Sequence, residues 1–144
     1  MKIELEPIGT FYTDAQDIPR HWSISEVTGR IEIDQRYAEG LKSIKAGDRI
    51  VVLFHFHKSG SFTPQKLVQN PPHRNKAMGV FSICSPYRPN PIGLSVLEVV
   101  AVEGSVLTVR HADMIDGTPI IDIKPYIADK HDCPSYKEAQ PGSA

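Results

Sequence analysis

Apolar and polar residues alternate along much of this chain, and a period of two is typical of β-strands rather than helices. Elsewhere the apolar residues gather in short β-branched and aromatic runs, which also favour strands. The predicted strands cover residues 2–8, 30–34, 49–57, 79–83, 94–102, 106–111 and 119–123. Glu103-Gly104-Ser105 separates two of these runs and predicts a hairpin there.

One segment has helical spacing instead. Tyr37, Leu41 and Ile44 recur at i, i+4 and i+7, and Asp34 stands where an N-cap is expected. Because long helices do not alternate with the strands, a Rossmann-type sheet is not expected. The pattern predicts a mainly β, single-domain protein: a closed or partly closed β-barrel over residues 1–127 with one or two short helices. Residues 128–144 are polar and predict a loosely attached tail.

The composition limits the possible partners. The 144 residues carry a net charge of -1, so any contact with RNA requires a local basic patch. No apolar run is long enough to span a bilayer, and the charged N-terminus does not resemble a signal peptide. The two cysteines form no metal-binding spacing. We therefore expect a cytoplasmic protein with reduced thiols and no membrane segment.

The stretch from Cys84 to Ser95 is the most unusual part of the sequence. It contains Pro86, Pro89 and Pro91, together with an arginine, an asparagine and a glycine. Proline fixes φ and biases the residue before it towards extended backbone, so this stretch predicts a rigid loop whose shape is set in advance. Such a loop suits the wall of a binding site, and the alternative is a structural corner between strands.

Two further segments combine polar groups that can bind ligands. Residues 18–22 hold Arg20, an imidazole and the only tryptophan, which suits either a ligand lip or a surface loop with Trp22 packed inward. His55 and His57 would share one face of a strand, as pocket residues or as a metal pair. A metal site would need a third ligand such as His73, His111 or Asp113.

Carboxylates gather late in the chain. Asp113, Asp116 and Asp122 lie within fourteen residues of one another, together with Lys124 and Tyr126. Carboxylates can accept hydrogen bonds from ribose hydroxyls or exocyclic amines, or lie beside a sulfonium charge. An aspartate between apolar walls can also act as a general base.

The runs from Arg88 to Ser95 and from Asp116 to Tyr126 together resemble the TsaA-like (YaeB/TrmO) family, in the same order. The resemblance extends to about Ile127. It implies a β-barrel methyltransferase that uses S-adenosyl-L-methionine and methylates N6 of threonylcarbamoyladenosine at position 37 of tRNA. It also implies a homodimer with the cofactor near the subunit interface.

Matching motifs carry this expectation to particular residues. Cofactor contacts are expected at Pro19, Arg20, His21, His57, Lys58, Cys84, Leu94, Asp113, Met114, Ile115 and Asp116. The candidate proton acceptors are Asp113, Asp116 and His57. Substrate contacts are expected at Arg88, Asn90, Lys124 and Tyr126, with Arg88, Lys58 and Arg74 as a patch for phosphates.

The sequence departs from the family pattern at two places, and these keep alternatives open. Cys84 stands where many relatives carry an arginine, and the chain ends at Ala144, whereas tRNA-modifying members have a further C-terminal region. One alternative is therefore methylation of a small molecule. Another is a non-catalytic module that binds S-adenosyl-L-methionine, and a third is a small metalloenzyme that uses His55 and His57.

Overall fold

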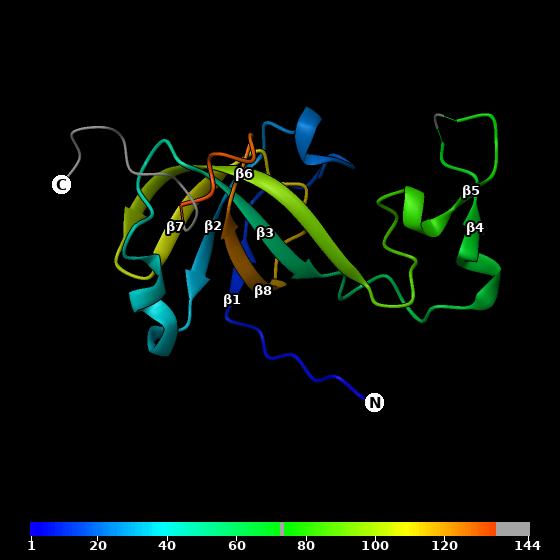
Figure 1. Ribbon diagram of the computed structural model, residues 1–144, viewed down its shortest axis with the longest axis horizontal. Coiled ribbons are helices and arrows are strands. Elements are labelled where there is room, and N and C mark those ends of the chain that lie inside the picture. The colour runs from blue at the N-terminus through cyan, green and yellow to red at the C-terminus, as the bar shows by residue number, and fades with distance from the viewer. Residues whose placement is uncertain (73, 135–144) are drawn as a thin grey trace.

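Six antiparallel strands close into a barrel in the computed structural model, which describes residues 1–72 and 74–134 (Figure 1). The strands are β1 (Gly9–Tyr12), β2 (Thr28–Ile33), β3 (Arg49–His55), β6 (Ile92–Glu103), β7 (Val106–Arg110) and β8 (Thr118–Pro125). Around the barrel they follow the order β1-β2-β7-β6-β3-β8. The mainly β barrel fold predicted from the sequence is confirmed, and the hairpin between β6 and β7 is confirmed with it.

Alternate residues of the strands fill the barrel interior. Val52 on β3 faces Ser95 on β6, and Ile50 faces Leu97 two residues along, so one face of each strand lines the core. The side chains that are completely buried there include Phe11, Ile31, Val52, Leu97, Val99, Leu107, Val109 and Ile120. Barrel closure follows from pairing between β1 and β8, where Gly9 lies opposite Ile120.

Four short 3₁₀ helices supply the helical part of the described chain. The predicted helix is confirmed in position as η2 (Gln35–Leu41), and the Asp34 side chain caps it by accepting the Arg36 N–H at 3.1 Å. Leu41 is its buried residue, as the apolar spacing indicates. The other three are η1 (Trp22–Ile24), η3 (Pro64–Leu67) and η4 (Val80–Ser82).

Residues 56–91 leave the barrel between β3 and β6 and form a separate lobe, seen at the right of Figure 1. The lobe contains η3, η4 and a two-stranded sheet of β4 (Val68–Gln69) and β5 (Met78–Gly79). Its two ends meet where the Phe56 N–H donates to the Pro91 carbonyl at 2.8 Å. The lobe therefore extends the β3–β6 pair beyond one end of the barrel.

Three strand boundaries predicted from the sequence are wrong. Residues 2–8 form no strand; their alternation lacks a partner strand, and Ile3 and Leu5 are exposed. The strand expected at 79–83 stops at Gly79, where η4 begins. β3 ends at His55, so His57 lies in the turn that follows and does not share a strand face with His55.

The end of the barrel is consistent with the predicted domain boundary, which stays a prediction. β8 ends at Pro125, and residues 128–134 contain neither helix nor strand. The remainder of the predicted tail, residues 135–144, lies outside the described residues. Within residues 1–72 and 74–134, no helix has the length and apolar character needed to cross a bilayer.

Gly93 in the proline-rich motif is required by close packing. A Cβ added there would lie 2.3 Å from Cζ of Phe54, the residue opposite it on β3. We predict that Gly93→Ala lowers the free energy of unfolding by about 1–3 kcal/mol because the Phe54 ring must move within a filled core. Urea unfolding measures this loss. Gly79→Ala is the control, since nothing lies within 4 Å of its Cβ position, and equal effects of both variants would contradict the explanation.

Candidate functional site

Polar side chains converge at the end of the barrel from which the lobe extends. There the loop between β7 and β8, residues 111–117, meets η1 and the first half of β6. Ser95 on β6 is completely buried and faces the interior beside Val52. Its hydroxyl donates a hydrogen bond to Oδ1 of Asp113. This bond joins the barrel interior to the carboxyl group that closes this end.

Two chain segments hold Asp113 in place. The buried Ser25 hydroxyl donates to the Ala112 carbonyl, and the Ala112 N–H donates to the Val27 carbonyl at 3.0 Å. His111 takes a left-handed backbone conformation with φ of 77°, and its Nδ1 lies 2.8 Å from the Ser25 carbonyl. These contacts fix the direction in which the chain leaves β7 and so position the next carboxylate.

The environment of Asp113 raises the pKa of its carboxyl group, and burial is the largest cause. Hydrogen bonds from Ser95 and from backbone groups of Asp113 and Trp22 act in the opposite direction, as does the nearby His21. Burial outweighs them. A partly desolvated carboxylate of this kind gains most when a positive charge comes to lie beside it.

The loop that contains His21 is organised by that histidine. Its Nδ1 accepts the Ser23 N–H at 3.2 Å and so caps η1, and its ring lies 5.0 Å from the Trp22 ring. Trp22 is half-buried, and Pro19 and Arg20 precede it on the same loop. The segment expected to form a ligand lip therefore lies beside Asp113, because η1 packs against β6.

The other residues of the β7–β8 loop differ in exposure. Asp116 is exposed and accepts the Thr13 N–H at 3.0 Å. Ile115 is also exposed, whereas Met114 is buried in the core and its side chain points away from solvent. The structure therefore brings Asp113, Ile115 and Asp116 to this end of the barrel. The buried Met114 side chain packs in the core and holds the loop against the barrel.

His57 and Lys58 lie at the base of the lobe, just after β3. Burial, followed by the neighbouring Lys58 charge, lowers the pKa of His57. Leu94 lies on β6 beside Ser95 but on the opposite, outer face, and it is 53% exposed. The expected cofactor contacts are thus divided between the barrel end and the outer surface next to the lobe.

The proline-rich loop is braced by its own arginine. Nη1 of Arg88 donates to the carbonyls of Ile83 and Ser85, both at 3.0 Å. Cys84 between them is an exposed free thiol, and Asn90 is exposed as well. The arginine that the sequence suggests for substrate binding therefore also holds the loop in shape.

Two predicted substrate contacts lie elsewhere. Lys124 lies in the last part of β8 and Tyr126 directly follows that strand, so both are at the end of β8 away from Asp113 and Asp116. Lys124 pairs with Asp122 at 3.0 Å, and the Arg49 guanidinium lies 4.3 Å from the centre of the Tyr126 ring. Proximity in sequence does not bring these residues to the carboxylate cluster.

Comparison with known proteins shows which protein family this chain belongs to. Residues 7–133 match the family model described as "tRNA-methyltransferase O N-terminal domain". The chain belongs to the tRNA-methyltransferase O N-terminal domain family. Within that family, it is 40% identical to a "S-adenosyl-L-methionine-binding protein" of Archaeoglobus fulgidus over 94% of this chain and 97% of that one.

Other members are longer than this chain. A human "tRNA (adenine(37)-N6)-methyltransferase" is 36% identical over 86% of this chain but only 30% of its own length. A "Probable S-adenosyl-L-methionine-binding protein" of Pyrococcus abyssi is 36% identical, with 84% and 66% covered. The crystal structure of TrmO from Pseudomonas aeruginosa superposes with a TM-score of 0.70 at 28% identity, covering 98% of this chain and 64% of that chain.

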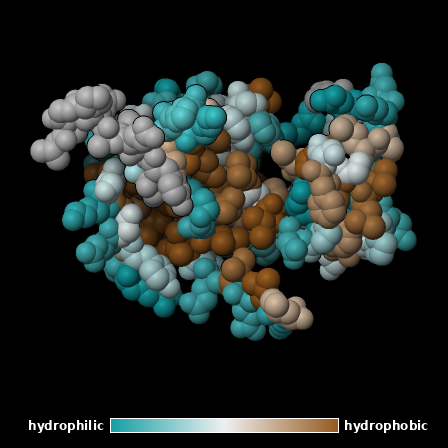
Figure 2. Space-filling model, in the orientation of Figure 1, coloured by the Kyte–Doolittle hydropathy of each residue, from teal (hydrophilic) through white to brown (hydrophobic). Residues whose placement is uncertain are grey.

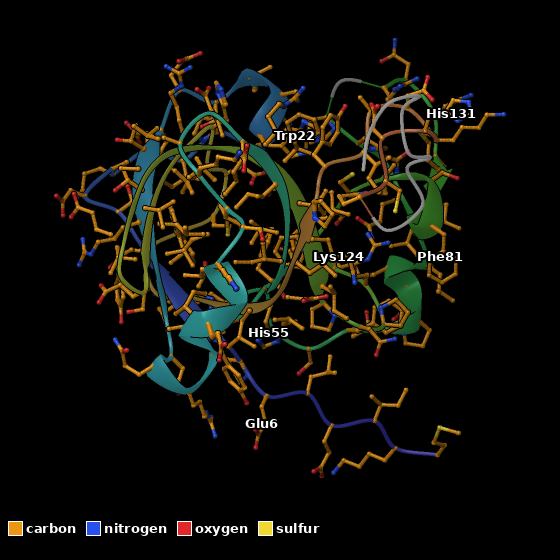
Figure 3. All side chains as sticks on the ribbon, turned by 60° about the vertical axis from the view of Figure 1, so that its left-hand side comes forward. Glu6, Trp22, His55, Phe81, Lys124 and His131 are labelled. Atoms are coloured by element: carbon orange, nitrogen blue, oxygen red, sulfur yellow. The ribbon has the colours of Figure 1, made fainter. Side chains whose placement is uncertain are left out.

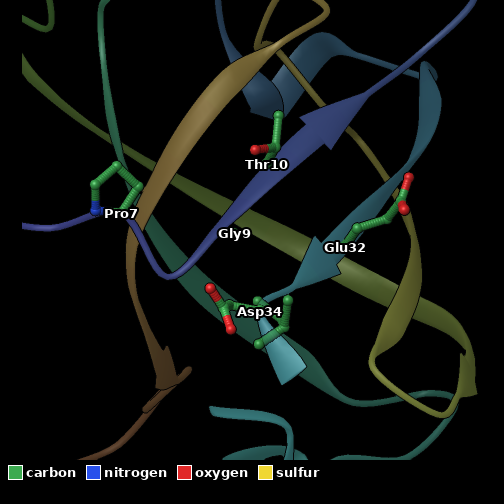
Figure 4. A pocket seen from close by; sticks show the side chains of 6 residues that line it. Pro7, Gly9, Thr10, Glu32 and Asp34 are labelled. Atoms are coloured by element: carbon green, nitrogen blue, oxygen red, sulfur yellow. The ribbon is translucent and has the colours of Figure 1, made fainter. Parts of the chain in front are cut away.

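Two hollows in the described part of the chain lie at the opposite end of the barrel. One of about 270 Å³ lies between the start of β1 and the end of β2 (Figure 4), and one of about 400 Å³ lies beside η2. The carboxylates of the first are already engaged, because Glu32 pairs with Arg30 at 2.9 Å and Asp34 caps η2. Neither hollow is lined by a residue for which the sequence predicts a cofactor contact.

In the part of the chain that the structure describes, no group of three or more His, Cys, Asp or Glu residues could hold a metal ion. His111 bonds to the Ser25 carbonyl and lies 3.5 Å from Glu98. His73, one of the candidate third ligands, lies outside the described residues.

Sequence reasoning missed the groups that support Asp113. Ser95 and Ser25 are the buried serines involved, and the Trp22 backbone contributes through η1. A signal for Ser95 does exist: it occupies an inward position of a strand whose other inward residues include Leu97 and Val99. A hydroxyl at such a position needs a partner, which points to a polar group above the core.

Asp113 should make stability depend on pH. Because its pKa in the folded protein exceeds the unfolded value of about 3.9, the folded state binds more protons between the two values. The free energy of unfolding therefore falls as pH rises through this window. In Asp113→Asn, this contribution disappears. Urea unfolding of both proteins from pH 3.5 to 7 measures the difference between them, and parallel curves would contradict the assignment.

Proposed function

We propose that this protein transfers a methyl group from S-adenosyl-L-methionine to N6 of an adenosine in tRNA, with threonylcarbamoyladenosine at position 37 as the acceptor. The observation that carries the proposal is the desolvated Asp113 carboxyl group, fixed by Ser95 next to the loop of His21. Family membership and the names of the relatives support it. Since the chain spans 66% of the Pyrococcus relative and 30% of the human one, the activity is a proposal.

The residues present fit this cofactor. When bound, the cofactor supplies an electrophilic methyl group on a positively charged sulfur. Asp113 and Asp116 provide negative charge at the barrel end, and the raised pKa of Asp113 means that a neighbouring cation stabilises its ionised form. Ile24 and Ile115 are exposed on the two elements beside these carboxylates and offer apolar surface to a purine ring.

His57 is the residue best suited to accept the proton. A carbamoylated adenosine N–H is a poor nucleophile, so its methylation requires a base near the reacting nitrogen. Burial and the Lys58 charge lower the pKa of His57, which favours the neutral imidazole, the form that can accept a proton. Asp113 is already hydrogen-bonded to Ser95, and Asp116 to Thr13, so both are better suited to holding the cofactor.

A second copy of the chain completes the site in our proposal. The expected cofactor contacts are divided, because Leu94 faces outward while Asp113 closes the barrel end. Exposed apolar side chains lie near this outer surface and on the lobe, namely Leu67, Val68, Ile92 and Leu94. We therefore propose that these exposed apolar side chains form the contact of a homodimer. We also propose that the enzyme is cytoplasmic. Sedimentation should give twice the chain mass of 16.0 kDa, and a monomer that still binds cofactor would contradict it.

The activity can be tested with labelled cofactor. Purified protein, methyl-labelled S-adenosyl-L-methionine and tRNA carrying threonylcarbamoyladenosine should yield one methyl group on that nucleoside, identified by mass spectrometry of the digest. A parallel reaction contains small metabolites in place of RNA. Label in metabolites alone would indicate a small-molecule methyltransferase. Cofactor binding by calorimetry without transfer to either pool would indicate a binding module.

The role of His57 predicts a pH profile. The rate of methyl transfer should be level near neutral pH and fall below the lowered pKa of His57, with a midpoint under about 6.5. His57→Gln should lower the rate at pH 7.5 by about 10²-fold or more and remove this acid limb. His55→Gln, a change at the exposed neighbour on β3, is the control. Retention of the acid limb in His57→Gln would assign the proton to another group.

A further inference from the structure

The lobe has a charge composition unlike that of the remaining chain. Residues 56–91 contain five basic residues and no aspartate or glutamate. The rest of the chain holds eleven basic residues against all seventeen acidic ones. The overall charge of -1 therefore hides a strongly positive lobe beside a negative barrel and tail. The five basic residues of the lobe are Lys58, Lys66, Arg74, Lys76 and Arg88.

The lobe and the barrel also differ in whether their cations form ion pairs with carboxylates. Several barrel cations pair with nearby carboxylates, as Arg110 does with Glu98 at 2.7 Å. The lobe has no carboxylate, and within the described residues none of its cations forms an ion pair. Four of them are exposed, while Arg88 braces its loop. Clustered like charges without carboxylates beside them do not stabilise a small lobe, but they do attract a polyanion.

Aromatic side chains accompany these charges. Phe81 is 80% exposed on η4, and Figure 3 places it on the lobe, away from the barrel. Tyr87 is 43% exposed, and the Lys66 ammonium lies 4.7 Å from the centre of its ring. Figure 2 shows hydrophilic surface along the upper rim of the lobe next to apolar surface. Exposed rings among cations are typical of proteins that stack unpaired bases while binding phosphates.

The position of the lobe relates these groups to the candidate site. Its base, closed by the Phe56 and Pro91 hydrogen bond, lies at the same barrel end as Asp113. His57 and Lys58 follow directly from that base. A polyanion bound along the lobe would thus continue towards the proposed methyl-transfer site.

We propose that the lobe, residues 56–91, is the surface that binds RNA next to an unpaired acceptor base. The exposed cations contact phosphates, and Phe81 stacks on a base outside a helix. This inference rests on the proposed RNA methylation and adds the surface that recognises the substrate. It also explains how a chain with a net charge near zero can bind nucleic acid.

Salt-dependent binding tests the phosphate contacts. Fluorescence anisotropy with a labelled anticodon stem-loop gives the slope of log affinity against log salt concentration. Lys66→Gln with Lys76→Gln should weaken binding at least tenfold at 0.1 M salt. The slope should become shallower by about 1.5, the value for two lost contacts. The matched control, Lys42→Gln with Lys45→Gln, removes two exposed lysines that follow η2 at the far end of the barrel, and it should leave both quantities unchanged.

Phe81→Leu tests stacking separately from charge. Leucine keeps an apolar side chain but removes the ring face, so affinity should fall about tenfold or more while the salt slope stays the same. Binding of S-adenosyl-L-methionine, measured by calorimetry, should not change in any of these variants. Sedimentation of each variant should show the same particle mass as the wild-type protein.

The outcomes separate this proposal from the proposed function. If the lobe variants bind the stem-loop as tightly as the wild type, RNA uses another surface and the lobe proposal is overturned, while RNA methylation stands. If Phe81→Leu changes the particle mass but not RNA affinity, Phe81 belongs to the dimer contact and not to a surface for RNA, and the proposal is equally overturned. If the wild type binds cofactor and methylates metabolites but not RNA, the proposed function fails first.

Discussion

Pairing between β1 and β8 is the contact on which the structure depends, because it joins the first and last strands of a barrel that otherwise would have two open edges. The ladder is short, running from Gly9 to Phe11, and it continues into the site through the Gly117 N–H, which donates to the Phe11 carbonyl at 2.8 Å. The loop that carries the carboxylates is therefore tied to the same closure that seals the core.

Alternation predicts the strands of this barrel well where each strand has one buried face and two neighbours. β3, β6, β7 and β8 are found close to their expected positions for that reason. The same alternation at residues 2–8 gives no strand: β1 begins only at Gly9, and Ile3 and Leu5 before it are exposed and bury no face. The missed strand, β1, has only four residues, too few for a periodic pattern to stand out.

The candidate site was predictable in part. Motif positions lead to Asp113, Asp116 and the His21 loop, and these do meet at one barrel end. Lys124 and Tyr126 follow closely in sequence yet lie apart, because an eight-residue strand carries the chain to the opposite end. The serine that fixes Asp113 comes from a different strand, so only the barrel register reveals it.

The single backbone hydrogen bond between Phe56 and Pro91 has a consequence for how such proteins diversify. The lobe leaves the barrel from β3 and returns to its neighbour β6. A longer segment inserted between two paired strands lowers stability mainly through the entropy lost on closing the loop, and this cost grows slowly with length. The sequence of the segment can be exchanged or extended while the register of β3 and β6 is kept. One barrel framework can in this way carry different surface segments without any change to its core.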